Sequence, residues 1–201
     1  MASKTDIANM ALSRLGETQI SDFTENTPNA IAVRLHYGTV LDSLLRMHNW
    51  NFATARATLT ALSTAPIFGH TYAYALPADC IRLSSLNGIQ ADQAETDFRI
   101  EGINLLTDAT AANICYVRRI EDTTLFDSLF VEVLILKLAA VLALDVTNSS
   151  TKRQEMLDEA AGMMDEASFS DASENTVEIL DPLGGSQYRQ QRSVDVYNDF
   201  Y

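Results

Sequence analysis

The sequence predicts an α+β fold, mainly α: an antiparallel four-helix bundle with an inserted small antiparallel β-domain and an extended C-terminal arm. Apolar residues recur with the helical period at both sides of a central segment, short β-like runs fill that segment, and regular patterning ends after residue 170. With 201 residues, of which 47% are hydrophobic, the chain is long enough to bury one sizeable core. We therefore expect a helical bundle at residues 1–59 and 123–170, a β insert at residues 60–122, and an arm at residues 171–201.

Four helices are predicted from their apolar stripes and their cap residues. Gly16 stands where a C-terminal cap belongs, and Thr27 followed by Pro28 is a start signal. The third helix is apolar nearly all round, which places it at the centre of a bundle, and a short polar turn makes it antiparallel to the fourth. The expected ranges are about Lys4 to Leu15, Thr27 to Asn49, Thr124 to Val146 and Ser150 to Phe169.

Short runs with strand character replace the helical period in the middle of the chain. Turn residues separate these runs, and Pro77, Asn87-Gly88 and Gly102 are the clearest breaks. A hairpin is expected at Glu101-Gly102, because strand-like residues stand on both sides of this pair. The expected strands are Thr71 to Leu76, Ile81 to Leu86, Phe98 to Ile100, Ile103 to Thr107 and Asn113 to Ile120.

The chain is acidic, and its charge is uneven. The net charge is −13, and residues 121–201 hold 5 Lys/Arg against 16 Asp/Glu. A protein that grips duplex DNA by its phosphates needs the opposite sign, so the composition excludes that class. An acidic wall suits a protein past which DNA slides, although acidity also serves simple solubility, and the charge alone favours this plainer explanation.

Sequence motifs of common catalytic and cofactor sites are absent. The chain contains no P-loop, GxGxxG, HExxH, CxxC or GxSxG pattern, and no pair of its many carboxylates is singled out for glycoside hydrolysis. We therefore expect no catalytic residue, no cofactor and no metal. The histidines, His36, His48 and His70, are expected on a helix surface or in packing rather than as ligands.

The sequence favours a chain that is made and kept in the cytosol. Polar residues open the sequence without a following apolar segment of the signal-peptide type. The most apolar stretch, Leu129 to Val146, carries Glu132, Lys137 and Asp145, so we interpret it as a core helix and expect no membrane contact. In that compartment the two cysteines, Cys80 and Cys115, are expected to be reduced and packed.

Five segments in a fixed order carry a family resemblance. Two are the most specific, Leu44 to Ala53 (LLRMHNWNFA) and Tyr72 to Arg82 (YAYALPADCIR). Over roughly residues 5–170, the set resembles the tail tubular protein A family of podovirus head-to-tail adaptors. The other three segments are Ile7 to Gly16, Arg99 to Thr107 and Ile114 to Arg118.

The resemblance implies a non-enzymatic structural protein of the virion tail or connector. In this family twelve identical subunits form a ring under the portal protein, extend the DNA channel and offer a face to the tail nozzle protein. Genomic DNA would pass through that channel without sequence-specific binding. Two other functions stay open: a tail-associated peptidoglycan hydrolase, and a small assembly or DNA-packaging factor.

Three groups of residues are predicted to serve such an adaptor. The motif residues Trp50, Phe52, Pro77 and Asp79 are expected to be structural, with the two aromatic residues fixing the junction of helix and sheet. A contact with the nozzle or a neighbouring subunit, or else a merely solvated loop, is expected at Asn87, Gln90, Asp92, Gln93 and Glu95. The portal-binding anchors of the arm, unless the arm folds back on its own bundle, would be Tyr188, Arg189, Arg192, Tyr197, Phe200 and Tyr201.

Overall fold

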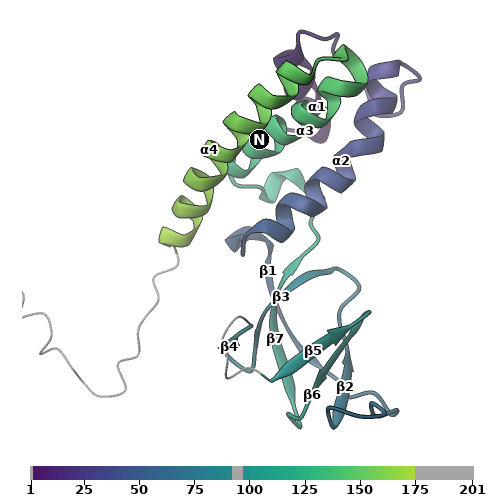
Figure 1. Ribbon diagram of the computed structural model, residues 1–201, viewed down its shortest axis with the longest axis vertical. Coiled ribbons are helices and arrows are strands. Elements are labelled where there is room, and N and C mark those ends of the chain that lie inside the picture. Colours follow the sequence, from purple (N-terminus) through teal and green to yellow (C-terminus); the bar gives the residue numbers. More distant parts are fainter. Residues whose placement is uncertain (1, 92–96, 175–201) are drawn as a thin grey trace, which may run out of the picture.

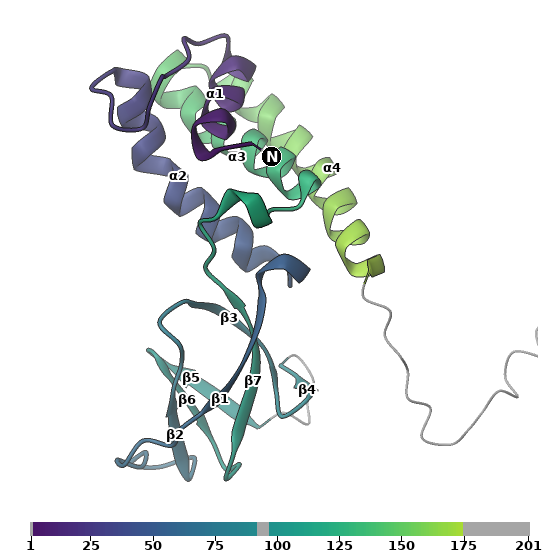
Figure 2. The ribbon, with the colours of Figure 1, turned by 180° about the vertical axis from the view of Figure 1, so that it is seen from behind.

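The computed structural model describes residues 2–91 and 97–174, and in this part of the chain it has four α-helices and two antiparallel sheets. The helices lie at one end of the molecule and the sheets at the other (Figures 1 and 2). The α+β class predicted from the sequence is therefore confirmed. No helix in the described part is long and apolar enough to cross a membrane.

The helices begin and end at the residues whose side chains or backbone suit a cap. Ser3 and Asp6 form a capping box before the first helix, and Thr27 accepts a hydrogen bond from the Ala30 N–H at the start of the second. Gly16, at φ 75°, ends the first helix in the left-handed region. The bounds are α1 Lys4–Leu15, α2 Pro28–Met47, α3 Ser128–Thr147 and α4 Ser150–Glu174.

Helix α3 is the centre of the helical part, and α1, α2 and α4 all pack against it. It has more buried residues than any other described helix, which confirms the expectation for the third helix. It starts at Ser128 rather than near Thr124, because the Asp127 carboxylate accepts hydrogen bonds from the Leu129 and Phe130 N–H groups. Residues Thr123–Leu125 form the short 3₁₀ helix η2 instead.

Helices α3 and α4 lie side by side and antiparallel, as the short polar turn predicts. Asn148, at φ 50°, ends α3 in the left-handed region, and α4 begins at Ser150 (Figure 1). Most residues of α4 are exposed, unlike those of α3, and its buried residues are Ala160, Ala167 and Asp171.

The strands form a four-stranded and a three-stranded sheet that enclose a second, smaller core. The first has the order β1-β7-β3-β4 and the second β2-β6-β5, with all pairs antiparallel. Glu101 pairs with Asn104, so the predicted hairpin at Glu101-Gly102 is confirmed. The bounds are β1 Thr54–Leu59, β2 Tyr72–Ala75, β3 Cys80–Leu86, β4 Ile89–Gln90, β5 Phe98–Glu101, β6 Asn104–Thr107 and β7 Ala112–Arg118.

Strand β7 connects the two cores. Ile114 and Tyr116 lie in the core between the sheets, whereas Val117 lies in the core of the helices. The alternation of a strand sends these residues to opposite faces. Ile120, just beyond the strand, is also buried in the helical core.

Besides the start of α3, three features differ from the sequence-based expectation. Strand β1, Thr54–Leu59, lies within residues 1–59, which we had placed in the helical bundle; its threonines, alanines and arginine give little apolar alternation. The two-residue strand β4 was also not expected. Helix α4 continues to Glu174, so residues 171–174 belong to it rather than to the arm; no glycine or proline interrupts it there.

The stability of the chain should fall in mild acid, because hydrogen bonds from turns and caps hold several exposed carboxyl groups in their charged form. The pKa of Asp6 lies below its ordinary value because the backbone N–H and hydroxyl of Ser3 donate to it, and the pKa of Asp22 is lowered in the same way by Thr24. Their contribution is present above the ordinary value of 3.8 and disappears as the pH falls through the lowered values. The Tm followed by circular dichroism should therefore stay level from neutral pH down to about pH 4 and drop below it.

The variant Ser3→Ala is the control for this prediction, because it removes the hydroxyl that donates to Asp6. It should have a smaller drop in Tm over the same pH range than the unchanged chain. A Tm that stays constant or rises as the pH falls would contradict the prediction.

Candidate functional site

The motif residues Trp50 and Phe52 lie where α2 passes into the first strand. Trp50 is fully buried, its Nε1–H donates to the Leu44 carbonyl at 3.1 Å, and its ring meets that of Phe130 at 5.0 Å between centroids. Phe52 lies 4.8 Å from the same Phe130 ring. Edge-to-face contacts of this kind hold the end of α2 against the start of α3, whereas the role expected for both residues at the junction of helix and sheet stays a prediction.

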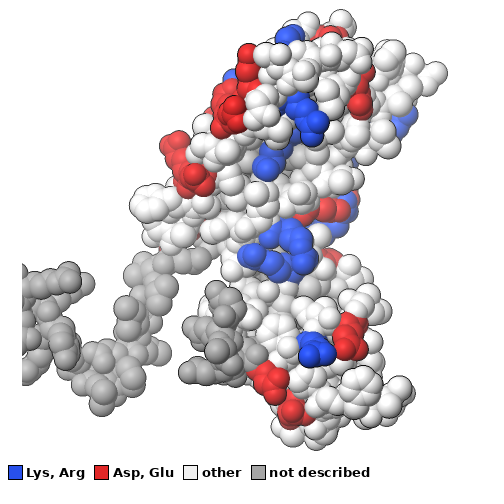
Figure 3. All heavy atoms as spheres, in the orientation of Figure 1, with Lys and Arg blue, Asp and Glu red and all other residues white. Residues whose placement is uncertain are grey.

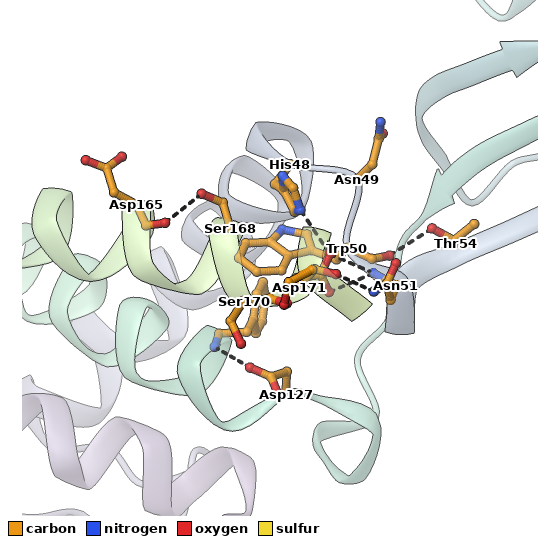
Figure 4. Close-up of polar contacts among 12 residues, drawn as sticks. His48, Asn49, Trp50, Asn51, Thr54, Asp127, Asp165, Ser168, Ser170 and Asp171 are labelled. Atoms are coloured by element: carbon orange, nitrogen blue, oxygen red, sulfur yellow. Dashed lines mark hydrogen bonds and ion pairs between the residues drawn. The ribbon is translucent and has the colours of Figure 1, made fainter. Parts of the chain in front are cut away.

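Asp171 in the last turns of α4 reaches the end of α2 (Figure 4). Its carboxylate accepts hydrogen bonds from His48 Nε2 at 2.9 Å and from the Asn51 backbone N–H at 3.0 Å. Its own carbonyl accepts from Asn51 Nδ2 at 2.7 Å. With 7% of its surface exposed, this carboxylate is buried yet well bonded, and we call the set of contacts to His48 and Asn51 the Asp171 contact.

Arginines join the helices to the first sheet, and Figure 3 shows blue side chains gathered between the two parts. Arg46 of α2 donates to the Ile81 carbonyl at 2.6 Å, and Arg82 of β3 donates to Asn49 Oδ1 at 2.6 Å. Arg119, just after β7, bonds Asp42 of α2 at 2.7 Å and also pairs with Glu121. These arginines are therefore engaged within the chain and hold its two parts together.

The motif residues Pro77 and Asp79 shape the turn before β3. The Pro77 carbonyl accepts from the Cys80 N–H at 3.0 Å, and the Asp79 carbonyl accepts from the Arg119 N–H at 2.7 Å. The Asp79 carboxylate accepts from the Tyr116 hydroxyl at 3.2 Å. Burial, followed by the charge of Asp79, raises the pKa of Tyr116, which keeps this hydroxyl a donor. Both motif residues thus have structural contacts, and Cys80 beside them is a free thiol, as is Cys115.

The turn between β3 and β4 contains the described part of the predicted nozzle or neighbour contact. Asn87 and Gly88 both have positive φ, 51° and 85°, as a tight hairpin turn requires. Asn87 Nδ2 donates to the Ala111 carbonyl and its Oδ1 accepts from the Asn113 N–H, each at 2.9 Å, so its side chain is occupied within the chain. Gln90 is exposed in β4, whereas Asp92, Gln93 and Glu95 lie outside the described residues.

The predicted portal-binding anchors all lie outside the described residues, and their role stays a prediction. The group comprises Tyr188, Arg189, Arg192, Tyr197, Phe200 and Tyr201. Helix α4, which precedes them, ends at Glu174.

Large apolar side chains are exposed on both parts of the molecule. In the loop between β1 and β2, Ile67 is 98% and Phe68 84% exposed. On the helices, Phe169 of α4 is 77% and Leu35 of α2 69% exposed. A groove of about 930 Å³, with apolar and polar walls, runs beside α1 and α3; among its lining residues are Met10, Phe126, Val131 and Ile135.

Two further groups of titratable side chains stand out. His36 of α2 and Asp145 of α3 pair at 2.6 Å between Nε2 and Oδ2, which ties these helices together. In the sheets, one ligand atom from each of His70, Asp97 and Asp108 lies within 4.8 Å of the others. This second group is the arrangement in the described part that suits a metal ion, and sequence reasoning missed it because the three residues are far apart in the chain.

The Asp171 contact should contribute measurably to stability. Replacing Asp171 with Ala removes the carboxylate that accepts from the Asn51 N–H and from His48, which should cost about 1–3 kcal/mol in the free energy of unfolding. The matched control is Asp165→Ala on the same helix, whose side chain is exposed and whose loss should change stability by less than about 0.5 kcal/mol. Urea unfolding followed by circular dichroism measures both; equal effects of the two variants would contradict the prediction.

Comparison with known proteins assigns the chain to no family. No family model matches the sequence, and none of the curated proteins matches it. The function is therefore inferred from the geometry of the chain and from its sequence motifs.

Proposed function

We propose that this chain is a structural head-to-tail adaptor of a short-tailed bacteriophage. Identical subunits would form a ring, of twelve copies by the family resemblance, between the portal protein and the tail nozzle protein. The finer architecture belongs to the same proposal: an antiparallel helical bundle as the body of the ring, the β-domain directed toward the tail, and residues 175–201 as an arm toward the portal. The role is mechanical and requires no catalytic group.

The observation that carries this proposal is the exposure of large apolar side chains on separate surfaces of one small chain. Ile67 and Phe68 stand on the sheet part, whereas Leu35 and Phe169 stand on two different helices. Single exposed apolar residues are ordinary, but nearly complete exposure of an adjacent Ile-Phe pair is costly in water unless a partner covers it. A ring subunit between two other rings needs several such surfaces, because it contacts neighbours on both sides as well as partners above and below.

The acidic surface of α4 suits a wall beside moving DNA. Figure 3 shows red side chains along this helix, and its exposed carboxylates are Glu155, Asp158, Glu159, Asp165, Glu166 and Glu174. Of these, Glu159 pairs with Arg14 of α1 at 2.9 Å. Repulsion between such a surface and phosphates would prevent sticking during packaging and ejection, which supports placing α4 toward the channel.

The motif residues support the same proposal in a different way. The contacts at the junction of the helices and sheets include those of Trp50, Phe52, Pro77 and Asp79. A chain with these four residues is therefore expected to have the same junction geometry. A resemblance carried by such residues concerns architecture rather than active-site chemistry. It therefore fits a protein whose function is its shape.

The proposal predicts that aromatic residues beyond α4 bind the portal. Replacing the arm aromatics with Ala should abolish co-sedimentation with portal rings and leave the Tm unchanged, because buried aromatic anchors often contribute about 2 kcal/mol or more each to an interface. The substituted residues are Tyr188, Tyr197, Phe200 and Tyr201.

A control variant replaces polar residues of the same segment with Ala and should still sediment with the portal. Its substituted residues are Gln187, Gln190, Gln191 and Asn198. A shortened chain that ends at Pro182 should behave like the aromatic variant. Full binding by this shortened chain would exclude the arm as the portal contact, and absence of any binding by the unchanged chain would exclude the adaptor role.

A further inference from the structure

One end of the three-stranded sheet brings together residues that are distant in sequence. Phe98 of β5 and Tyr72 of β2 both pair with Thr107 of the central strand β6. The residues next to these pairs therefore meet at the same end: Asp97 before β5, Asp108 after β6, and His70 shortly before β2. One ligand atom from each of these three side chains lies within 4.8 Å of the others.

The histidine of this group has a buried nitrogen that lacks a hydrogen bond. His70 is 12% exposed in its side chain, and its Nδ1 is buried with no hydrogen-bond partner among the described residues. The nearest carboxylate oxygen, Oδ2 of Asp108, is 3.7 Å away, which is longer than a hydrogen bond. A buried ring nitrogen without a partner is costly, and an ion bound between the nitrogen and the oxygen removes that cost.

The carboxylates are arranged as ligands rather than as an ion pair. The backbone N–H and the hydroxyl of Thr71 both donate to Asp108 Oδ1 at 2.7 Å, which leaves Oδ2 facing His70. This second layer of contacts orients a metal ligand in known sites. Asp97 and Asp108 flank the Phe98–Thr107 pair, and two like charges facing each other across strands are destabilising without a cation between them.

We propose that His70, Asp97 and Asp108 bind one divalent transition-metal ion of the Zn²⁺ type. Zinc binds imidazole nitrogen and carboxylate oxygen at about 2.0–2.2 Å, so two of its ligand atoms lie no more than about 4.3 Å apart. The 3.7 Å between Nδ1 and Oδ2 already meets this limit, and the widest separation, within 4.8 Å, needs only a small side-chain movement. A histidine ligand favours such an ion over Ca²⁺ or Mg²⁺, which take oxygen ligands, and water completes the coordination.

The ion would fix the loop that presents the exposed apolar pair. Ile67 and Phe68 precede His70 by three and two residues, in a loop that joins β1 to β2. A metal bond between His70 and the ends of β5 and β6 would hold this loop against the second sheet. This inference replaces the sequence-based expectation that His70 is no ligand, and it does not depend on the adaptor role.

The test is a Zn²⁺ titration of the full chain after removal of metals with a chelator. Calorimetry should give about one ion per chain, and the ion should raise the Tm because it binds the folded state. Replacing His70 with Gln should weaken the affinity at least about tenfold. The matched control His36→Gln removes another histidine that faces an aspartate, and it should keep the affinity unchanged.

A second variant and a Co²⁺ spectrum test the same metal site. The side chain of Asp97 makes no hydrogen bond within the described part, and its charge repels that of Asp108, so Asp97→Asn should hold or raise the apo Tm and still weaken Zn²⁺ binding. This variant tests the site even where His70→Gln fails to fold. Co²⁺ in place of Zn²⁺ should give visible bands without thiolate charge transfer. No rise in Tm, unchanged affinity in both variants, or a thiolate spectrum that assigns the ion to Cys80 or Cys115 would each overturn the site.

Discussion

The Asp171 contact is the interaction on which the arrangement of this chain depends most. It joins the end of α4 to the end of α2 across 120 residues of sequence, at the point where the chain leaves the helices and enters the sheets. Asn51, which donates to Asp171 through its backbone, is also the first residue of the 3₁₀ helix η1 that leads into β1. The direction in which the first strand leaves the helical part is therefore set by a residue near the end of the last helix.

Around that contact, packed side chains and hydrogen bonds join the helices to the sheets. Trp50 fills the helical core beside Phe130, and Val117 of β7 enters the same core from the sheet. Arg46 of α2 donates to the Ile81 carbonyl of β3, and Arg119, just after β7, donates to Asp42 of α2. A junction with a buried aromatic centre and charged bridges resists bending.

The sequence was informative where local chemistry determines structure. The cap residues Thr27 and Gly16 and the apolar surface of the third helix predicted the four helices, although α3 begins four residues later and α4 ends five residues later than expected, and Gly102 predicted a hairpin. Strand β1 was not predicted, because its own composition favours a strand only weakly. Its pairing with β7, more than fifty residues away, stabilises it. The contact of Asp171 with His48 and the group of His70 and Asp108 were not predicted for the same reason. These residues have no recognisable spacing in the sequence and meet only through the fold.

Hydrogen exchange at one backbone amide measures whether the end of α4 holds the helix–sheet junction in place. The Asn51 N–H donates to the buried Asp171 carboxylate, and a hydrogen bond that opens only with the folded core protects its proton as strongly as the amides of α3. We predict that Asn51 exchanges at the slow rate of the α3 residue Leu138, which is buried in the helical core. Exchange of Asn51 as fast as that of an exposed loop amide such as Phe68 would contradict the account.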